Sequence, residues 1–72
     1  MTQEQIITIV KKSLKIKTIN KNSSSKNIEK WDSLGHLNIM AQLDKKTKGK
    51  SSKIDLTNCT SIKTLSKALS NI

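Results

Sequence analysis

Ser33 is the residue of this 72-residue chain whose type and position suggest chemistry most directly. The pair Asp32-Ser33 is an N-cap signal in front of a helical pattern, so the Ser33 hydroxyl is expected in the exposed first turn of a helix. The unpaired N–H groups of such a turn and the helix dipole favour a phosphate placed beside them. Ser33 is therefore a candidate site for a phosphoester. The simpler interpretation is that Asp32-Ser33 only caps the helix.

The residues that follow Ser33 are expected to support this turn. Leu34 and Leu37 are predicted to point inward as anchors of the helix. Gly35 has no side chain and leaves room for a group or a partner that approaches the turn. Glycine costs a helix about 1 kcal/mol relative to alanine, and a close approach would explain why that cost is tolerated.

The other residues that could act as nucleophiles, bases or ligands are too few for a catalytic site. One histidine, one cysteine and five acidic residues form no triad, carboxylate pair or metal cluster in the sequence. His36 has no second histidine or cysteine within a helical turn, and it is expected to be a solvated or partner-facing side chain. Cys59 lies between Leu56 and Ile62, where a small buried hydrophobic residue is expected. No internal disulfide is possible, and we do not expect an enzyme.

The spacing of apolar residues predicts two helices in the first two thirds of the chain. Residues 3–15 form an amphipathic helix that Thr2 can cap, with Ile9 off the apolar face. Residues 33–46 form a second helix, and Gly49 suits the left-handed position after its C-terminus. The residues expected to face the core are Ile6, Ile7, Val10 and Leu14 in the first helix, and Leu34, Leu37, Met40, Ala41 and Leu43 in the second.

A third helix and two connections complete the chain. Thr60 or Ser61 can cap a last helix, whose apolar residues are Ile62, Leu65, Leu69 and Ile72. A turn or single helical turn is expected near residues 57–60, and residues 16–30 form a long loop that isolated isoleucines can pin to the core. The sequence thus predicts an all-α fold of three main helices plus one short helix, with a long first loop.

Length and composition limit the chain to one small domain over residues 1–72. Only 33% of the residues are hydrophobic and Trp31 is the single aromatic residue, so the core is expected to be thin and aliphatic. No apolar run approaches the roughly 18 residues of a membrane span, and the first residues lack the layout of a secretory signal. The chain is expected to be soluble and cytoplasmic.

The run WDSLGHLNI at residues 31–39 follows the long loop and continues to the Leu-Asp pair at residues 43–44. This run resembles the 4'-phosphopantetheine attachment region of acyl and peptidyl carrier proteins. The resemblance extends over nearly the whole chain, from the amphipathic first helix to the capped last helix around residues 60–62. It implies a four-helix carrier bundle that stands alone. Trp31 and the GHL continuation look more like carriers of specialised pathways than like the housekeeping fatty-acid carrier.

The resemblance implies that a phosphopantetheinyl transferase joins 4'-phosphopantetheine from coenzyme A to Ser33. The thiol of this arm would carry acyl or aminoacyl groups as thioesters between ligase or synthase enzymes, and tethering raises their effective concentration. Fatty-acid, polyketide, aminoacyl and cell-envelope D-alanyl pathways all remain open. Asp32 and Leu34 would help these enzymes recognise the turn, and we include Gly35 and His36 among the recognition residues. A monomer is expected.

The charge of the chain departs from that family, whose members are usually acidic. Fourteen lysines against five acids leave a formal net charge of +9, and Lys45 and Lys46 lie on the helix where carriers usually present acids. Charge complementarity steers docking and suppresses wrong partners. We therefore expect Lys45 and Lys46 to contribute to recognition by enzymes whose docking surfaces are acidic or largely apolar.

The charge of +9 also favours a rival function, that of a small basic helical module that binds nucleic acid or an acidic protein without being modified. Against nucleic acid, every basic residue is a lysine, so the arginine forks that read guanine are absent. The lysines are scattered over every segment, and no aromatic stacking platform exists. We therefore expect no nucleic-acid partner. An unmodified scaffold is a third possibility, against which Ser33 argues.

Overall fold

Each α-helix is preceded by an N-cap residue whose side chain accepts a hydrogen bond from a backbone N–H of the first turn. The computed structural model describes residues 1–72 and contains α1 (Gln3–Leu14), α2 (Ser33–Lys46), the 3-10 helix η1 (Lys50–Lys53) and α3 (Ile62–Ala68). The N-caps are Thr2, Asp32 and Ser61, which accept from the backbone N–H groups of Gln5, Gly35 and Thr64. The predicted all-α fold of three main helices plus one short helix is confirmed, as are the caps.

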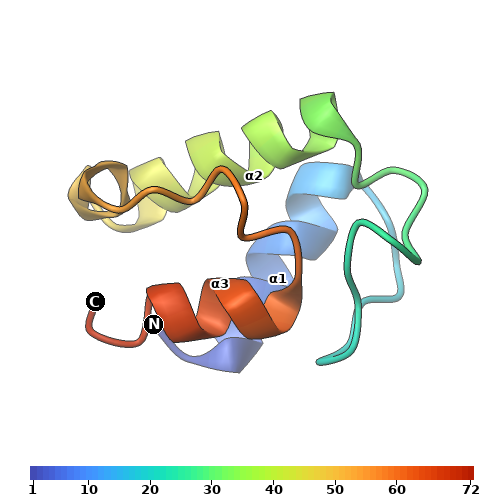
Figure 1. Cartoon of the computed structure of the whole chain (residues 1–72), viewed down its shortest axis with the longest axis horizontal. Coiled ribbons are helices and arrows are strands. Elements are labelled where there is room, and N and C mark those ends of the chain that lie inside the picture. The colour runs from blue at the N-terminus through green and yellow to red at the C-terminus, as the bar shows by residue number, and fades with distance from the viewer.

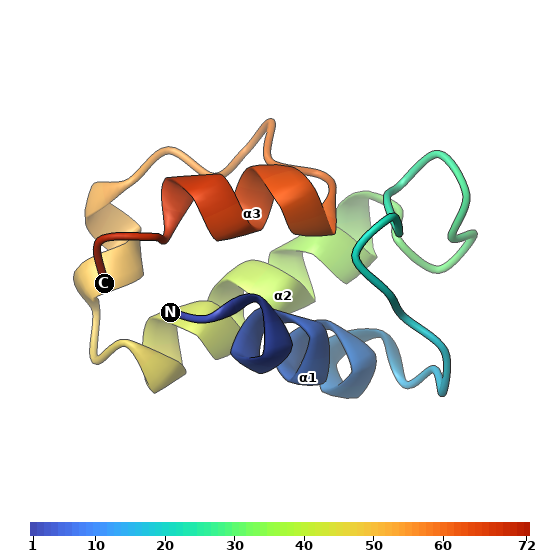
Figure 2. The ribbon, with the colours of Figure 1, turned by 90° about the horizontal axis from the view of Figure 1, so that it is seen from below.

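The helices pack around α1. It contacts both α2 and α3, and η1 packs against α2 near its C-terminal end (Figures 1 and 2). The two chain ends lie near each other in both views, and the Met1 ammonium group donates hydrogen bonds to the carbonyl oxygens of Leu69 and Ile72. None of the helices is both long and apolar enough to cross a membrane.

The core differs from the expected one in two ways. Ile9 faces the core whereas Ile7 is only half-buried, because α1 is covered by α2 on one side and by α3 on another and so buries a wider face. The core is also not purely aliphatic, since Trp31 is its largest member and is 2% exposed. The twelve buried apolar residues are Ile6, Ile9, Val10, Leu14, Ile19, Trp31, Ile39, Leu43, Leu56, Ile62, Leu65 and Leu69.

The orientation of α2 about its axis also differs from the prediction. Its bounds agree with the predicted residues 33–46, but Leu34 and Leu37 are 73% and 59% exposed and are not inward anchors. Ala41 is exposed and Met40 is half-buried. The buried face consists instead of Gly35, His36, Ile39 and Leu43, which recur at helical spacing. The helix therefore presents leucines to solvent and a histidine to the core.

The long loop between α1 and α2 is fixed to the start of α3. The Ser25 N–H donates to the Thr60 carbonyl at 2.8 Å, and the Ile62 N–H donates to the Ser23 carbonyl at 3.0 Å. The isoleucines of the loop also contact the core as expected, Ile19 being buried and Ile16 and Ile28 half-buried. The loop is therefore part of the folded unit.

The short helix lies before residues 57–60, where only a turn is present. Gly49 has a positive φ of 86° and turns the chain after α2, in the left-handed conformation predicted for it. The Thr47 hydroxyl then accepts the backbone N–H of Ser51 at 3.0 Å, which supports η1. The sequence of η1 is KSSK, which has no apolar periodicity and so carried no helical signal.

Candidate functional site

Ser33 is the first residue of α2 and its side chain is exposed. The preceding residue, Asp32, has an extended backbone, and its carboxylate accepts the Gly35 N–H at 2.8 Å. The Asp32 carbonyl accepts the His36 N–H at 2.8 Å. The amides of Ser33 and Leu34, the first two of the helix, have no acceptor in the protein. The exposed hydroxyl therefore lies beside two free N–H donors at the positive end of the helix dipole, as predicted.

A groove of about 500 Å³ opens beside Ser33, and we call it the Ser33 groove. Its lining comes from α2 and the two residues before it, and from hydroxyl-bearing residues of the long loop and of the segment before α3. The lining residues are Ser25, Trp31, Asp32, Ser33, His36, Leu37, Met40, Thr57 and Thr60. A group attached to Ser33 would enter this groove directly.

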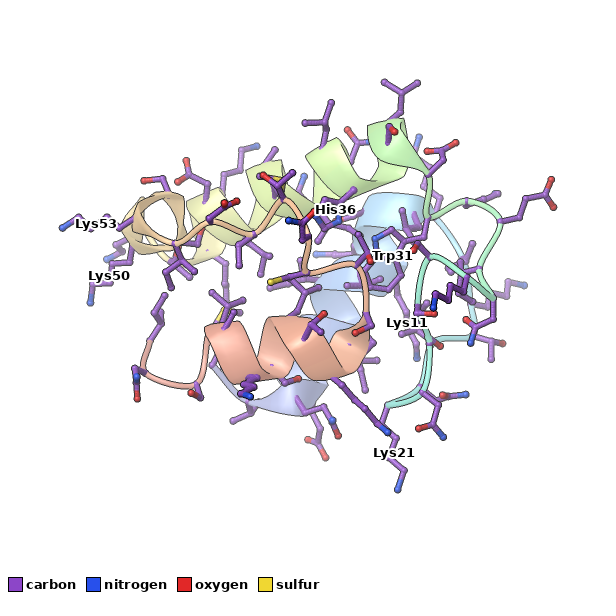
Figure 3. All side chains as sticks on the ribbon, in the orientation of Figure 1. Lys11, Lys21, Trp31, His36, Lys50 and Lys53 are labelled. Atoms are coloured by element: carbon purple, nitrogen blue, oxygen red, sulfur yellow. The ribbon has the colours of Figure 1, made fainter.

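His36 lies inside the protein and not at the surface. Its side chain is 8% exposed, so the prediction of a solvated or partner-facing histidine is wrong. The Trp31 indole N–H donates to His36 Nδ1 at 3.1 Å, and His36 Nε2 lies 2.8 Å from the Leu56 carbonyl oxygen. The two rings, labelled in Figure 3, are nearly parallel, with an interplanar angle of 20° and centroids 6.3 Å apart. Since the indole nitrogen can only donate, the proton of the neutral His36 ring is assigned to Nε2, which donates to Leu56.

Gly35 is also buried, and the space beside it is occupied by other residues of the protein. A Cβ atom at this position would overlap the Lys30 carbonyl oxygen and would lie 2.8 Å from Cδ2 of Leu14. The space that glycine leaves is therefore filled by the protein itself. The expected role of Gly35 in admitting a partner is corrected to one in packing the loop and α1 against α2.

The lysines predicted to guide partners lie at the other end of α2. Lys45 and Lys46 are exposed in its last turn, and a helix of this length places them about 20 Å from Ser33. Together with Lys12 of α1 they line a second groove of about 520 Å³, which we call the basic groove. The basic groove is as large as the Ser33 groove, but the hydroxyl at its helix start, that of the N-cap Thr2, already accepts the Gln5 N–H. We therefore take the Ser33 groove as the candidate functional site.

Cys59 packs against the core as a small hydrophobic residue, but it is half-buried and not buried as expected. Burial raises the pKa of its thiol above the ordinary value, and the negative charge of Asp55 raises it further. A raised pKa keeps the thiol protonated and weakly nucleophilic at neutral pH. No three His, Cys, Asp or Glu side chains lie close enough together to hold a metal ion.

Comparisons with protein-family models, with curated proteins and with solved structures find no match. The structure brings the exposed side chains of Asp32, Ser33 and Leu34 together at one end of α2.

The sequence did not indicate which loop residues line the Ser33 groove. Ser25, Thr57 and Thr60 come from loops, where side-chain positions have no periodic signal. The sequence also did not predict that Leu37 is exposed. The buried face of α2 begins with a glycine and a histidine, which are less apolar than leucine and so gave a weaker signal. The equal spacing of Gly35, Ile39 and Leu43 was the signal that could have identified that face.

Proposed function

We propose that Ser33 is the attachment site of a 4'-phosphopantetheine arm and that the chain carries acyl or aminoacyl groups as thioesters on this arm. The observation that carries the proposal is an exposed serine hydroxyl in the first turn of α2, beside free amides and an open groove. The bundle holds this turn outward and supplies no catalytic group of its own. The cargo would be chosen by the partner enzymes, in fatty-acid, polyketide or other specialised biosynthesis.

The attachment step would be a phosphoryl transfer from coenzyme A. The Ser33 Oγ would attack the phosphorus nearer the pantetheine, the bond to the bridging oxygen would break, and adenosine 3',5'-bisphosphate would leave. The hydroxyl proton would pass to a base of the transferase. The free N–H groups of Ser33 and Leu34 would stabilise the phosphodiester that results, because helix N-termini favour anions.

The residue types that line the Ser33 groove are suited to contacts with a phosphopantetheine arm. Pantetheine alternates short carbon chains with amide groups, so it needs both apolar contacts and hydrogen-bonding groups. The lining of the groove includes the apolar residues Leu37 and Met40 and the hydroxyl-bearing residues Ser25, Thr57 and Thr60. The arm could therefore rest on the protein between transfers.

Partner enzymes would contact the exposed residues around Ser33. Asp32, Leu34 and Leu37 surround the attachment site on the surface, and the two leucines are the large hydrophobic side chains that the fold leaves exposed. Lys45 and Lys46 would add a second, positively charged contact at the far end of α2. Because these lysines replace the acids of ordinary carriers, the partner surface there would be acidic or largely apolar.

Intact-protein mass spectrometry tests the proposal. The protein is incubated with coenzyme A and a broad-specificity phosphopantetheinyl transferase, in parallel with Ser33→Ala and with Ser25→Ala, a control serine of the same groove. The wild type and Ser25→Ala should gain one phosphopantetheinyl group, and Ser33→Ala should gain none. A gain in Ser33→Ala, or no gain in the wild type with several transferases, would overturn the proposal.

The net charge favours a second candidate, an unmodified basic module that binds an acidic protein or nucleic acid. The basic groove between α1 and α2, with Lys12, Lys45 and Lys46, would be its contact surface. Binding to duplex DNA that persists at physiological salt, in a protein that no transferase modifies, would support this candidate. Binding only at low salt would not, because that is the behaviour of any cation with this charge.

A further inference from the structure

The Trp31–His36 pair is a buried polar contact in a core that is otherwise aliphatic. The chain contains one tryptophan and one histidine, and each is in contact with the other. Burying polar groups is costly unless their hydrogen bonds are made. Here both ring nitrogens of His36 and the indole N–H have partners, and Ser66 Oγ is the one buried side-chain polar atom without one. The pair is therefore a satisfied network that holds a defined geometry.

The two residues occupy special positions relative to the helix start. Asp32 is the N-cap, so Trp31 is the residue before the cap and His36 is the fourth residue of α2. Side chains at these two positions often pack together and fix the angle at which the chain approaches the helix. In this protein the contact joins two nearly parallel rings by a directional hydrogen bond, which restricts that angle further. Ser33 lies between the two residues, so its direction depends on the same angle.

The second bond of His36 reaches a third segment. Leu56 precedes the turn that contributes Thr57 and Thr60 to the Ser33 groove, and its carbonyl oxygen lies 2.8 Å from His36 Nε2. His36 thereby links the loop before α2, α2 itself and the segment between η1 and α3 (Figure 3). These three segments contribute Ser33 and the other residues that line the Ser33 groove.

We infer that His36, neutral and with its proton on Nε2, is a positioning residue that fixes the direction of the Ser33 hydroxyl and the width of the Ser33 groove. This inference rests on the proposed function of Ser33 as an attachment site. His36 is buried and both of its ring nitrogens are bonded within the protein, so it would act on Ser33 through Trp31 and Leu56.

Two substitutions separate this role from simple packing. His36→Phe keeps an aromatic ring but removes both hydrogen bonds. It leaves the indole N–H without a partner and the Leu56 carbonyl with the Cys59 N–H alone. His36→Gln keeps one donor and one acceptor on a shorter planar group. Leu69→Ala is the control, because Leu69 is buried after α3 near the chain ends and lies outside the Ser33 groove. All variants are assayed at a temperature where circular dichroism shows them folded.

The measurement is the kcat and KM of phosphopantetheine transfer to each variant. His36→Phe should lower kcat/KM by roughly ten- to a hundredfold, the size expected when a reacting group is misplaced by about 1 Å. His36→Gln should recover most of the loss, and Leu69→Ala should match the wild type. Transfer to folded His36→Phe at the wild-type rate, or a Gln variant as slow as the Phe variant, would overturn the inference.

A readout that does not depend on modification keeps the two proposals separate. In amide NMR spectra of the unmodified protein, His36→Phe should shift the signals of Ser33, Leu34 and Thr57, and Leu69→Ala should leave them in place. If no transferase modifies the wild type, the proposed function fails, and these spectra still decide the positioning role. Unchanged Ser33 and Leu34 signals in His36→Phe would overturn it.

Discussion

The backbone of Gly35 packs directly against Lys30, so that a Cβ atom on Gly35 would overlap the Lys30 carbonyl oxygen. This contact holds the end of the long loop against the first turn of α2. Glycine at this position therefore allows the close contact, although it lowers the intrinsic stability of the helix by about 1 kcal/mol relative to alanine.

Gly35→Ala is therefore expected to destabilise the protein despite its better helix propensity. The Lys30 oxygen belongs to the backbone and can yield only if the loop moves, which we expect to cost about 2 kcal/mol in the free energy of unfolding. Urea unfolding measures this change. Asn38→Ala, at an exposed position of the same helix, is the control and should stay within about 0.5 kcal/mol of the wild type. A Gly35→Ala variant more stable than the wild type would contradict the packing.

Substitutions of Asp32 separate its capping role from its recognition role. Asp32→Ala removes the acceptor of the Gly35 N–H and should lower the free energy of unfolding by about 1 kcal/mol. Asp32→Asn keeps a capping oxygen and should change stability by only a few tenths of a kcal/mol. If the carboxylate charge is read by the transferase, Asp32→Asn should nevertheless slow the modification of Ser33. An Asn variant that is modified at the wild-type rate would limit Asp32 to capping.

The exposed leucines should matter for binding and not for folding. Leu37→Ala is expected to change the free energy of unfolding by less than about 0.5 kcal/mol, because the side chain is 59% exposed. Ile39→Ala, two residues further along α2 and fully buried, should cost about 2–5 kcal/mol. Thermal unfolding of both variants checks the orientation of the helix. Equal losses would mean that Leu37 is an anchor after all.

Reversing the charge at the end of α2 should weaken docking to a cognate enzyme. The Lys45→Glu, Lys46→Glu variant should associate more slowly than the wild type, and the difference should shrink as salt screens the charges. Lys63→Glu, Lys67→Glu on α3 has the same net charge and is the matched control. Stopped-flow association rates over a range of salt concentrations make the comparison. Faster association of the α2 variant would contradict an acidic or apolar partner surface.

The Cys59 thiol should react slowly. Because its pKa is raised, a smaller fraction is thiolate near pH 7 than in free cysteine, and the alkylation rate should rise only as the pH increases through the raised pKa. Asp55→Asn removes the nearby negative charge and should speed the reaction. Iodoacetamide labelling followed by mass spectrometry measures these rates. In a protein carrying the arm, the pantetheine thiol should be labelled before Cys59. Labelling of Cys59 as fast as free cysteine at neutral pH would contradict the raised pKa.

The helices were predictable because their signals are local. The cap at Asp32, the lysines at Lys45 and Lys46 and the turn at Gly49 all lie within or beside α2, and together they defined its bounds. Capping bonds involve residues three apart, so they can be recognised from the sequence without knowledge of the rest of the fold.

The direction in which α2 faces was not predictable from local periodicity. Leu34 and Leu37 are more apolar than Gly35 and His36, so the apolar pattern selected the wrong face. The inward face is favoured by contacts that join distant segments, such as the bond of His36 to Leu56, twenty residues away. The attachment role of Ser33 is a proposal, because a capped serine at a helix start gives the same sequence pattern whether or not it is modified.

The backbone bonds that join the long loop to the start of α3 determine how an attached arm would move. Ser25 and Thr60 are paired through the main chain, so they cannot separate without breaking that bond. The main-chain bond therefore holds these two members of the groove lining next to each other. An arm attached to Ser33 would thus pass a joined edge of loop and helix start, and would change direction by rotation about its own bonds.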